Sequence, residues 1–227
     1  MHARAIQSQS GNASLSSEDV IVKANGACRV VTLDRPKALN ALTMPMIQQL
    51  TFVFKYCENN PHVGSILLKG GRKQVDACDF VVCLGKTFFF KKKKRVDNRL
   101  ALPHASFTPG ADTPQGKPCF CAGGDVRGIL ATTDDKFGKE FFRQEYVLNH
   151  LTSVLKTPYI SVLNGVTMGG GAGLSLHGRY RVVTENTLFA MPECAIGLVP
   201  DVGGTYFLSR LAGNLGRSAA RHGCIVV

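Results

Sequence analysis

The chain has 227 residues, which is enough for one large domain or two small ones with a buried core. Hydrophobic residues make up 44% and charged residues 19% of it, which excludes a disordered tail, a collagen and a coiled coil. No run of about 18 apolar residues occurs, so we expect no membrane-spanning helix. Composition predicts a soluble globular protein.

The net charge of +11 is concentrated in residues 71–118. Three phenylalanines at 88–90 are followed there directly by the basic run 91–95. A nucleic-acid-binding face is expected to spread over folded elements, with aromatic side chains between the basic ones. We therefore interpret the block as a solvated or disordered loop and predict no nucleic-acid partner. Nucleic-acid binding through residues 86–95 is the weakest alternative.

The eight cysteines form no CxxC pair, and no Cys and His spacing is typical of zinc, so we predict no metal site. In a chain of this length without a secretory signal they indicate reduced thiols inside a cell. Residues 1–17 carry Arg4, five serines and no acidic residue. This composition fits a mitochondrial transit peptide or a disordered start.

Residues 20–69 carry clear secondary-structure signals. Two β-branched runs, 20–24 and 28–33, are separated by an Asn-Gly pair and predict a hairpin. Thr43 is the expected N-cap of a helix that stops before Pro61, and residues 65–69 read as a short buried strand. The predicted buried stripe of that helix is Ile47, Leu50, Val53 and Phe54.

No sustained period appears from Gly71 to Pro118, and structureless stretches of this length are unusual inside compact domains, so we predict an insertion. Strands and helices then alternate. The predicted elements are a short helix from Asp125, a helix over 138–155, a strand over 159–163, a helix from Gly169 to Leu176, strands over 181–184 and 188–190, and a loop entering a helix over 201–211. The alternation predicts an α/β domain with crossover connections.

Two glycine-rich turns each precede a helix, one at Gly123-Gly124 and one at Gly169-Gly170. Glycine lets the backbone approach a ligand closely, and two free N–H groups that converge on a carbonyl oxygen would form an oxyanion hole. From spacing alone, a tight turn or close helix packing explains each turn better. Neither turn has the spacing of a P-loop or of a dinucleotide-binding loop.

Glu193 is the only charged residue between Thr187 and Pro200. A carboxylate in apolar surroundings has a raised pKa and can act as a base or nucleophile near neutral pH; the alternative is a carboxylate that caps the turn after the preceding proline. Asp201 is either a second acid or a helix cap. The helix over 138–155 is expected to bury one apolar arc, which holds Val147, Leu148, Leu151, Val154 and Leu155. Glu145 lies at the edge of this arc, and the pattern alone favours a solvated position.

Four segments together resemble the crotonase (enoyl-CoA hydratase/isomerase) superfamily. They are LDRPKALNAL (33–42), FCAGGDVRGI (120–129), NGVTMGGGAGLSLHGRYRVVTEN (164–186) and FAMPECAIGLVPDVGGTYFLSRL (189–211). Within the superfamily, three stretches are similar to the 3-hydroxyisobutyryl-CoA hydrolase subgroup: FFRQEYVLNH (141–150), MGGGAGLSLHG (168–178) and FAMPECAIGLVPDVGG (189–204). The resemblance implies a ClpP-like α/β spiral fold of repeated ββα units, of which this chain would hold the N-terminal core.

The resemblance also implies roles. The N–H groups of Gly124 and Gly170 would polarise a thioester carbonyl, and Glu193 corresponds to the catalytic carboxylate of the family. Asp201 corresponds to the second acid of the hydrolases and Glu145 to their substrate-contacting Glu. Glu193, or a water that it activates, would attack the thioester. The implied substrate is an acyl-CoA, and no cofactor is expected because coenzyme A belongs to the substrate.

Gly173 stands where hydratases of the superfamily carry a second Glu, which disfavours water addition across a double bond. Two alternatives remain open: an enoyl-CoA isomerase or hydratase, and a non-catalytic crotonase-like protein.

Residues 1–17 are expected to be a transit peptide or a disordered start. An incomplete crotonase-like domain is expected over 18–216, interrupted by the insertion at 71–118, and is followed by a divergent tail at 217–227. We expect a mitochondrial location, with a peroxisomal or cytosolic location as the alternatives. We expect no membrane partner, and a homo-oligomer is compatible with the sequence.

Overall fold

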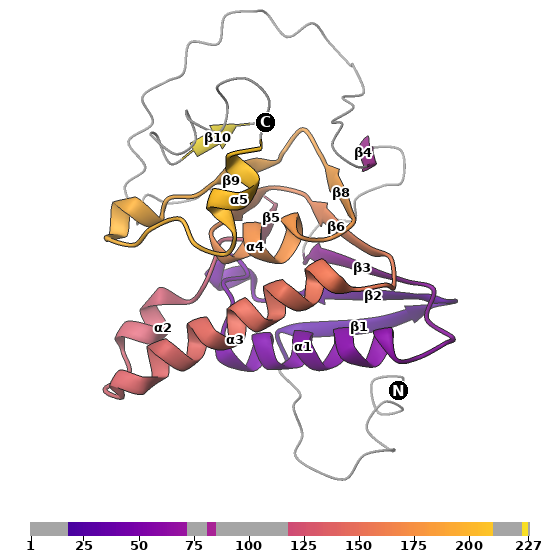
Figure 1. Ribbon diagram of the computed structural model, residues 1–227, viewed down its shortest axis with the longest axis horizontal. Helices are drawn as coiled ribbons and strands as arrows, with labels where there is room; N and C mark the ends of the chain where they lie inside the picture. Colours follow the sequence, from indigo (N-terminus) through magenta and orange to yellow (C-terminus); the bar gives the residue numbers. More distant parts are fainter. Residues whose placement is uncertain (1–17, 72–80, 85–117, 211–223, 227) are drawn as a thin grey trace, which may run out of the picture.

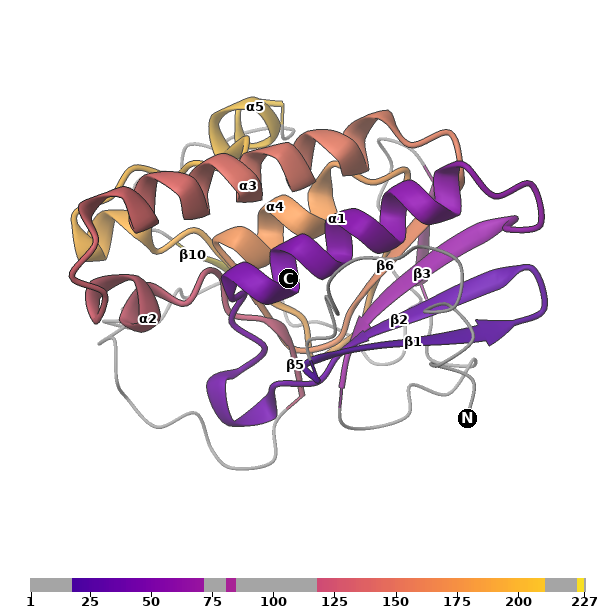
Figure 2. The same ribbon diagram turned by 90° about the horizontal axis from the view of Figure 1, so that it is seen from below.

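The computed structural model describes residues 18–71, 81–84, 118–210 and 224–226. They form two β-sheets with helices packed against them (Figure 1). The larger sheet has the strand order β1-β2-β3-β6-β8-β4, and the smaller one has the order β10-β9-β7-β5. Helices α1 and α3 lie side by side over one face of the larger sheet (Figure 2).

The N-terminal segment confirms the predicted hairpin and helix. Strands β1 (Val20–Asn25) and β2 (Cys28–Leu33) pair antiparallel, and helix α1 (Met44–Glu58) then leads to β3 (Ser65–Gly70), which pairs parallel to β2. The Thr43 hydroxyl accepts a hydrogen bond from the Met46 N–H and so caps the helix. The four residues of α1 that are predicted to form the buried stripe are all buried. The apolar residues recur with the 3.6-residue helical period because one face of α1 packs on the sheet.

From β3 onward the chain repeats a ββα unit that gives one strand to each sheet. The elements are β5 (Cys119–Cys121), α2 (Val126–Leu130), α3 (Asp135–Val154), β6 (Tyr159–Leu163), β7 (Val166–Met168), α4 (Gly170–Leu176), β8 (Tyr180–Val183), β9 (Leu188–Ala190) and α5 (Gly204–Leu208). Strands β3, β6 and β8 are parallel neighbours in the larger sheet, and β5, β7 and β9 are parallel neighbours in the smaller one. This repetition confirms the predicted α/β fold of ββα units.

Helix α3 differs from the prediction at its start and on its surface. It begins at Asp135 rather than at residue 138, because the Asp134 carboxylate accepts a hydrogen bond from the Lys136 N–H and caps the helix. Val147 and Val154 were expected on the apolar arc but are 43% and 54% exposed. The helix packs against both α1 and α4, and its contacts follow those two neighbours rather than one stripe.

Two short strands fall in segments without a clear sequence signal. Strand β4 (Val81–Leu84) pairs antiparallel with β8 at the edge of the larger sheet. This strand lies inside the insertion that is predicted to be a solvated or disordered loop, so for these four residues the structure differs from the prediction. The reason is that a β-branched run can pair with the open edge of a sheet through its backbone hydrogen bonds. Strand β10 (Cys224–Val226) pairs antiparallel with β9. The remaining predictions for 1–17, for most of 71–118 and for 211–223 lie outside the described residues.

The hydrophobic core has two parts. The larger one fills the space between the larger sheet and helices α1 and α3, and the smaller one joins β9, α4 and α5 through Phe189, Met191, Ala172, Val202 and Leu208. The smaller core anchors the loop that carries Asp201, because Val202 is 5% exposed within it. In the part of the chain that the structure describes, no helix is long and apolar enough to span a bilayer.

Candidate active site

The site lies at the carboxyl ends of the three parallel strands of the smaller sheet. Strands β5, β7 and β9 are adjacent, with Cys121 opposite Thr167 and Met168 opposite Ala190. Each strand is followed within three residues by one of the predicted site residues. Gly124 follows β5, Gly170 follows β7 and Glu193 follows β9. Because parallel strands end at the same edge of a sheet, these three predicted residues come together, as ligand sites do in other α/β folds.

The two glycine turns are in direct contact. A Cβ added to Gly170 would lie 3.3 Å from the backbone nitrogen of Gly124, and one added to Gly123 would lie 3.6 Å from the nitrogen of Gly170. Gly123 and Gly169 have φ angles of +108° and +48°, which a residue with a side chain rarely adopts. Neither the Gly124 N–H nor the Gly170 N–H has a hydrogen-bond partner among the described residues. Two unpartnered donors therefore lie side by side.

Contacts with the 33–42 segment hold the first turn in place. The Leu42 N–H donates to the carbonyl of Gly123 at 2.7 Å, and the Asp125 N–H donates to the carbonyl of Leu42 at 2.8 Å. The Arg35 guanidinium lies 2.8 Å from the Asp125 carboxylate, which also caps α2. These bonds use the peptide groups on either side of Gly124 and leave its own N–H free to donate.

Glu193 points into this junction. A Cβ added to Gly169 would lie 2.9 Å from its Oε1, the residue is 7% exposed, and neither carboxylate oxygen has a hydrogen-bond partner among the described residues. Burial, with a smaller contribution from the charge of Asp201, raises the pKa of Glu193 to about 7. This carboxyl group therefore exchanges its proton near neutral pH, as the isolated position in the sequence predicts.

Glu145 also reaches the junction, where it lies against Gly170. It is 2% exposed, its Oε1 would collide with a Cβ at Gly170, and this atom has no hydrogen-bond partner in the described part of the chain. The solvated position favoured by the helix pattern is therefore wrong, because the Glu145 side chain packs against Gly170 at the start of α4. Burial, followed by the charges of Asp201 and Glu193, raises the pKa of Glu145 to about 8.

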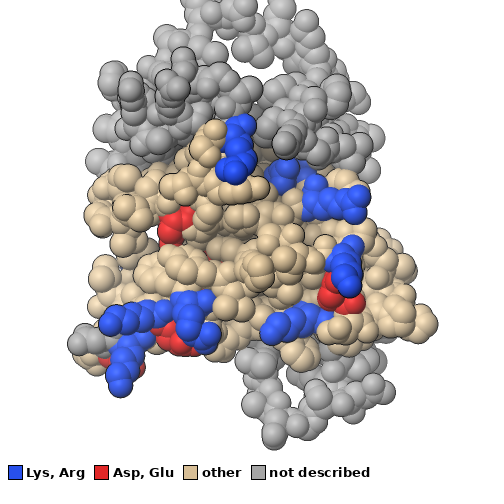
Figure 3. Space-filling model, in the orientation of Figure 1, with Lys and Arg blue, Asp and Glu red and all other residues tan. Residues whose placement is uncertain are grey.

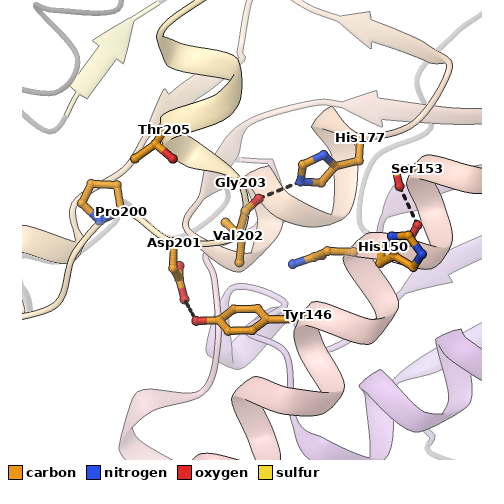
Figure 4. Close-up of a pocket in the computed structure, with 10 residues that line it drawn as sticks. Tyr146, His150, Ser153, His177, Pro200, Asp201, Val202, Gly203 and Thr205 are labelled. Atoms are coloured by element: carbon orange, nitrogen blue, oxygen red, sulfur yellow. Dashed lines mark hydrogen bonds between the residues drawn. The ribbon is translucent and has the colours of Figure 1, made fainter.

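Asp201 comes from the loop before α5 and lies within electrostatic reach of both glutamates. Its Oδ2 accepts a hydrogen bond from the Tyr146 hydroxyl at 2.7 Å (Figure 4). Burial and this bond to Asp201 raise the pKa of Tyr146, so the phenol stays a donor. The next residue, Val202, has a φ of +42°, which is strained for a β-branched side chain, and its carbonyl accepts from His177 Nε2 at 2.7 Å.

Tyr146 and His177 were not found by sequence reasoning. Tyr146 follows Glu145 on an exposed-looking part of its helix, and His177 is one of six scattered histidines. Tyr146 bonds to Asp201, which lies 55 residues further along the chain, and His177 bonds to Val202, which lies 25 residues further along. The sequence carries no local signal for either contact.

A pocket of about 460 Å³ opens beside this cluster, between α3, the end of α4 and the loop 200–205 (Figure 4). Its polar lining residues include Tyr146, Asn149, His150, His177, Asp201 and Thr205. The site therefore combines two N–H donors, three carboxyl groups and a hollow with hydrogen-bonding walls. Such a set suits the polarisation of a carbonyl and its attack by a carboxylate or by water.

The described residues hold no group of three or more His, Cys, Asp or Glu side chains arranged for a metal ion. Five of their cysteines are free thiols, and burial raises the pKa of Cys57 to about 11 and that of Cys119 to about 12, so these two are unreactive.

Figure 3 shows the distribution of charged side chains on one face of the molecule. The Lys and Arg side chains of that face form separate groups, several of them beside acidic ones, rather than one basic stripe.

Comparison with known proteins identifies the family. The sequence model of the family described as enoyl-CoA hydratase/isomerase matches residues 28–78 and 113–224. The chain belongs to the enoyl-CoA hydratase/isomerase family. The match includes the four motif segments and the residues of the cluster, and it passes over residues 79–112, which lie inside the predicted insertion.

Curated members of this family that resemble the chain are named 3-hydroxyisobutyryl-CoA hydrolases. The mitochondrial protein of Gallus gallus is 39% identical over 210 residues, which cover 92% of this chain and 43% of the relative. The mitochondrial protein of Homo sapiens is 39% identical, with 88% and 41% covered, and a probable hydrolase of Arabidopsis thaliana is 38% identical, with 88% and 42% covered. The chain thus spans about two fifths of the length of these relatives.

Solved structures of the family share the fold. A carnitinyl-CoA dehydratase from Mycobacterium thermoresistibile matches with a TM-score of 0.68 and 35% identity, covering 92% of this chain and 49% of that one. An enoyl-CoA hydratase from Rhodobacter sphaeroides 2.4.1 matches with a TM-score of 0.66 and 32% identity, covering 90% and 49%. The crotonase-like fold expected from the sequence is thereby confirmed.

Proposed function

We propose that this chain hydrolyses acyl-CoA thioesters of the 3-hydroxyisobutyryl type to the free acid and coenzyme A, a step of valine breakdown. The observation that carries the proposal is the junction itself. Two unpartnered N–H groups, of Gly124 and Gly170, face a buried Glu193 whose two carboxylate oxygens also lack partners in the described structure. The names of the curated relatives support the same reaction.

In the proposed reaction the thioester oxygen accepts hydrogen bonds from Gly124 and Gly170. These bonds stabilise the negative charge that develops on that oxygen when the carbonyl carbon is attacked. Glu193 then follows one of two routes. Its carboxylate attacks the carbon to give a mixed anhydride that water hydrolyses, or it removes a proton from a water that attacks directly. In both routes the C–S bond breaks, the sulfur leaves with a proton, and one water is consumed.

Glu145 and Asp201 assist this chemistry. With its pKa raised to about 8, Glu145 is mostly protonated at pH 7 and donates a hydrogen bond to the substrate. Asp201, which accepts from Tyr146, orients the water or takes up a proton. Since coenzyme A arrives as part of the substrate, the reaction needs no cofactor.

Gly173 supports hydrolysis over hydration, because it offers no carboxylate for a second acid–base step. The relatives named mitochondrial support a mitochondrial location for this chain as well. Assembly of several copies stays a prediction.

The direct test measures coenzyme A release from 3-hydroxyisobutyryl-CoA by the full chain and by Glu193→Gln. We expect Glu193→Gln to lower kcat at least about 10²-fold, the scale on which a catalytic carboxylate contributes. Glu140→Gln is the matched control, because Glu140 is partly exposed on α3 and its only partners among the described residues are Arg143 and Gln144. Equal release by wild type and Glu193→Gln would refute the proposal.

Two further arms separate the alternatives. Hydroxylamine added during turnover would trap a mixed anhydride as a hydroxamate, in excess of the hydroxamate that it forms with the thioester in the absence of enzyme, whereas the direct water route gives no such excess. An isomerase activity on enoyl-CoA that survives Asp201→Asn would favour the isomerase reading. Tight binding of thioesters without turnover would favour a non-catalytic protein.

A further inference from the structure

Asn149 is a buried amide without an assigned task. It lies on α3 one helical turn after Glu145 and lines the 460 Å³ pocket. It is 5% exposed, and neither its Oδ1 nor its Nδ2 has a hydrogen-bond partner among the described residues. A buried amide left unpaired is destabilising, and such groups in native proteins nearly always have a partner. A ligand that enters the pocket would supply one.

Gly173 makes room for this amide. A Cβ at that position would lie 2.8 Å from Asn149 Nδ2 and would also collide with Val202. The amide therefore lies in the space that a side chain at 173 would need. Gly173 follows Gly170 by one turn of α4, so it lies about 4.5 Å further along the helix axis.

This separation matches the length of a short acyl group. With the thioester oxygen at the Gly124 and Gly170 N–H groups, a hydroxyl on the third acyl carbon lies three bonds from the carbonyl carbon, or about 4 Å away. An amide suits a hydroxyl, because its Nδ2 donates and its Oδ1 accepts, and a hydroxyl does both. An acyl chain without that hydroxyl leaves both amide atoms unpaired.

We propose that Asn149 is a specificity-determining residue that hydrogen-bonds the hydroxyl of a short 3-hydroxyacyl thioester and so selects it over the acyl group that lacks the hydroxyl. This inference rests on the proposed function for the position of the thioester carbonyl. The discrimination follows from the unpaired amide, since a site built to bond a hydroxyl rejects the analogue without it far more strongly than an apolar pocket can.

The test compares kcat/KM for 3-hydroxyisobutyryl-CoA and isobutyryl-CoA in the full chain. Wild type should prefer the hydroxylated thioester at least tenfold. Asn149→Leu, which is close in size, should lose most of that preference, because kcat/KM falls for 3-hydroxyisobutyryl-CoA while it rises for isobutyryl-CoA, which no longer leaves an amide unpaired. Asn149→Ala and Asn149→Ser form a matched pair of small variants, of which only the serine retains part of the preference. Ser153→Ala is the control, because the Ser153 hydroxyl already donates to the carbonyl of His150 (Figure 4), so the ratio should not change.

An equal fall for both thioesters in every Asn149 variant would show a structural role and overturn the inference. A wild type that hydrolyses both thioesters equally would also overturn it, while the proposed function would stand. Where wild type hydrolyses neither, calorimetry with the two ketone analogues, in which a methylene replaces the sulfur, gives the ratio of Kd values instead. Loss of that ratio in Asn149→Leu supports the inference, an unchanged ratio overturns it, and the absence of any binding overturns both proposals.

Discussion

At the scale of single residues, two buried carboxyl groups distinguish the candidate site. Glu193 lies against Gly169 and Glu145 against Gly170, and burial raises the pKa of each well above the ordinary value of 4.5, to about 7 and about 8. Asp201 adds to both shifts because its negative charge disfavours ionisation of its neighbours. At neutral pH one group is thus partly ionised while the other is mostly protonated.

This difference predicts a bell-shaped pH dependence of kcat/KM for thioester hydrolysis. Glu193 must be ionised to attack or to activate water, so the rate rises as pH passes about 7. Glu145 must be protonated to donate, so the rate falls as pH passes about 8. The measurement is initial rates between pH 5.5 and 9.5 at low substrate concentration.

Glu145→Gln provides the control for that profile, since an amide donates a hydrogen bond but does not ionise. The alkaline fall should disappear in this variant, and the rise near pH 7 should stay. An unchanged alkaline limb would exclude Glu145 as its origin.

At the scale of elements, a hydrogen bond from the end of α4 holds the loop before α5. His177, just after α4, donates from Nε2 to the carbonyl of Val202, whose φ of +42° is unfavourable for a valine. The ring also packs edge-on against Phe207 of α5. These contacts keep the strained residue in place and fix the direction of Asp201 beside it.

We expect His177→Phe to weaken this hold while it keeps the aromatic packing. The loss of one hydrogen bond, about 1 kcal/mol, should lower the Tm by about 2–4 °C, and displacement of Asp201 should lower kcat about tenfold. His177→Gln, which restores a donor, should recover most of the kcat. Thermal unfolding and turnover are measured on the same samples; a kcat equal to wild type in His177→Phe would mean that the loop holds Asp201 without the histidine.

At the scale of the whole molecule, the two ends of the predicted insertion lie close together. A Cβ at Gly70 would lie 2.9 Å from the Cα of Phe120, so the end of β3 packs on the start of β5. The Gly71 N–H donates to the carbonyl of Leu33 and anchors the first end. A connection of a few residues can therefore join the two strands.

Replacement of residues 72–117 by a Gly-Ser-Gly linker is expected to preserve both cores and the Gly124 turn. Shortening a long loop adds up to about 2 kcal/mol of stability by loop-closure entropy, against the loss of the edge strand β4. Far-UV circular dichroism should show a folded protein, and coenzyme A release should equal or exceed that of the full chain. An unfolded product would show that this segment is part of the core.

The sequence alone determined the elements whose signals are local. The hairpin follows from β-branched runs around an Asn-Gly turn, and α1 follows from a capping threonine and a regular apolar stripe. The glycine turns and the isolated Glu193 were also visible, because ordered motifs and a lone charge in an apolar stretch need no knowledge of neighbours in space. The family, and with it the fold, followed from those motifs.

Only the tertiary structure decided what depends on distant contacts. Strands β5 and β7 have three residues each, too few to show a period, yet their shared edge brings Gly124 and Gly170 together. Glu145 is buried because its side chain packs against Gly170 at the start of α4, against the expectation from its own helix pattern, and Asn149 is left unpaired in the space that Gly173 provides. Periodicity reports which way a side chain faces along one element, whereas burial and pairing at a site depend on the elements that pack against it.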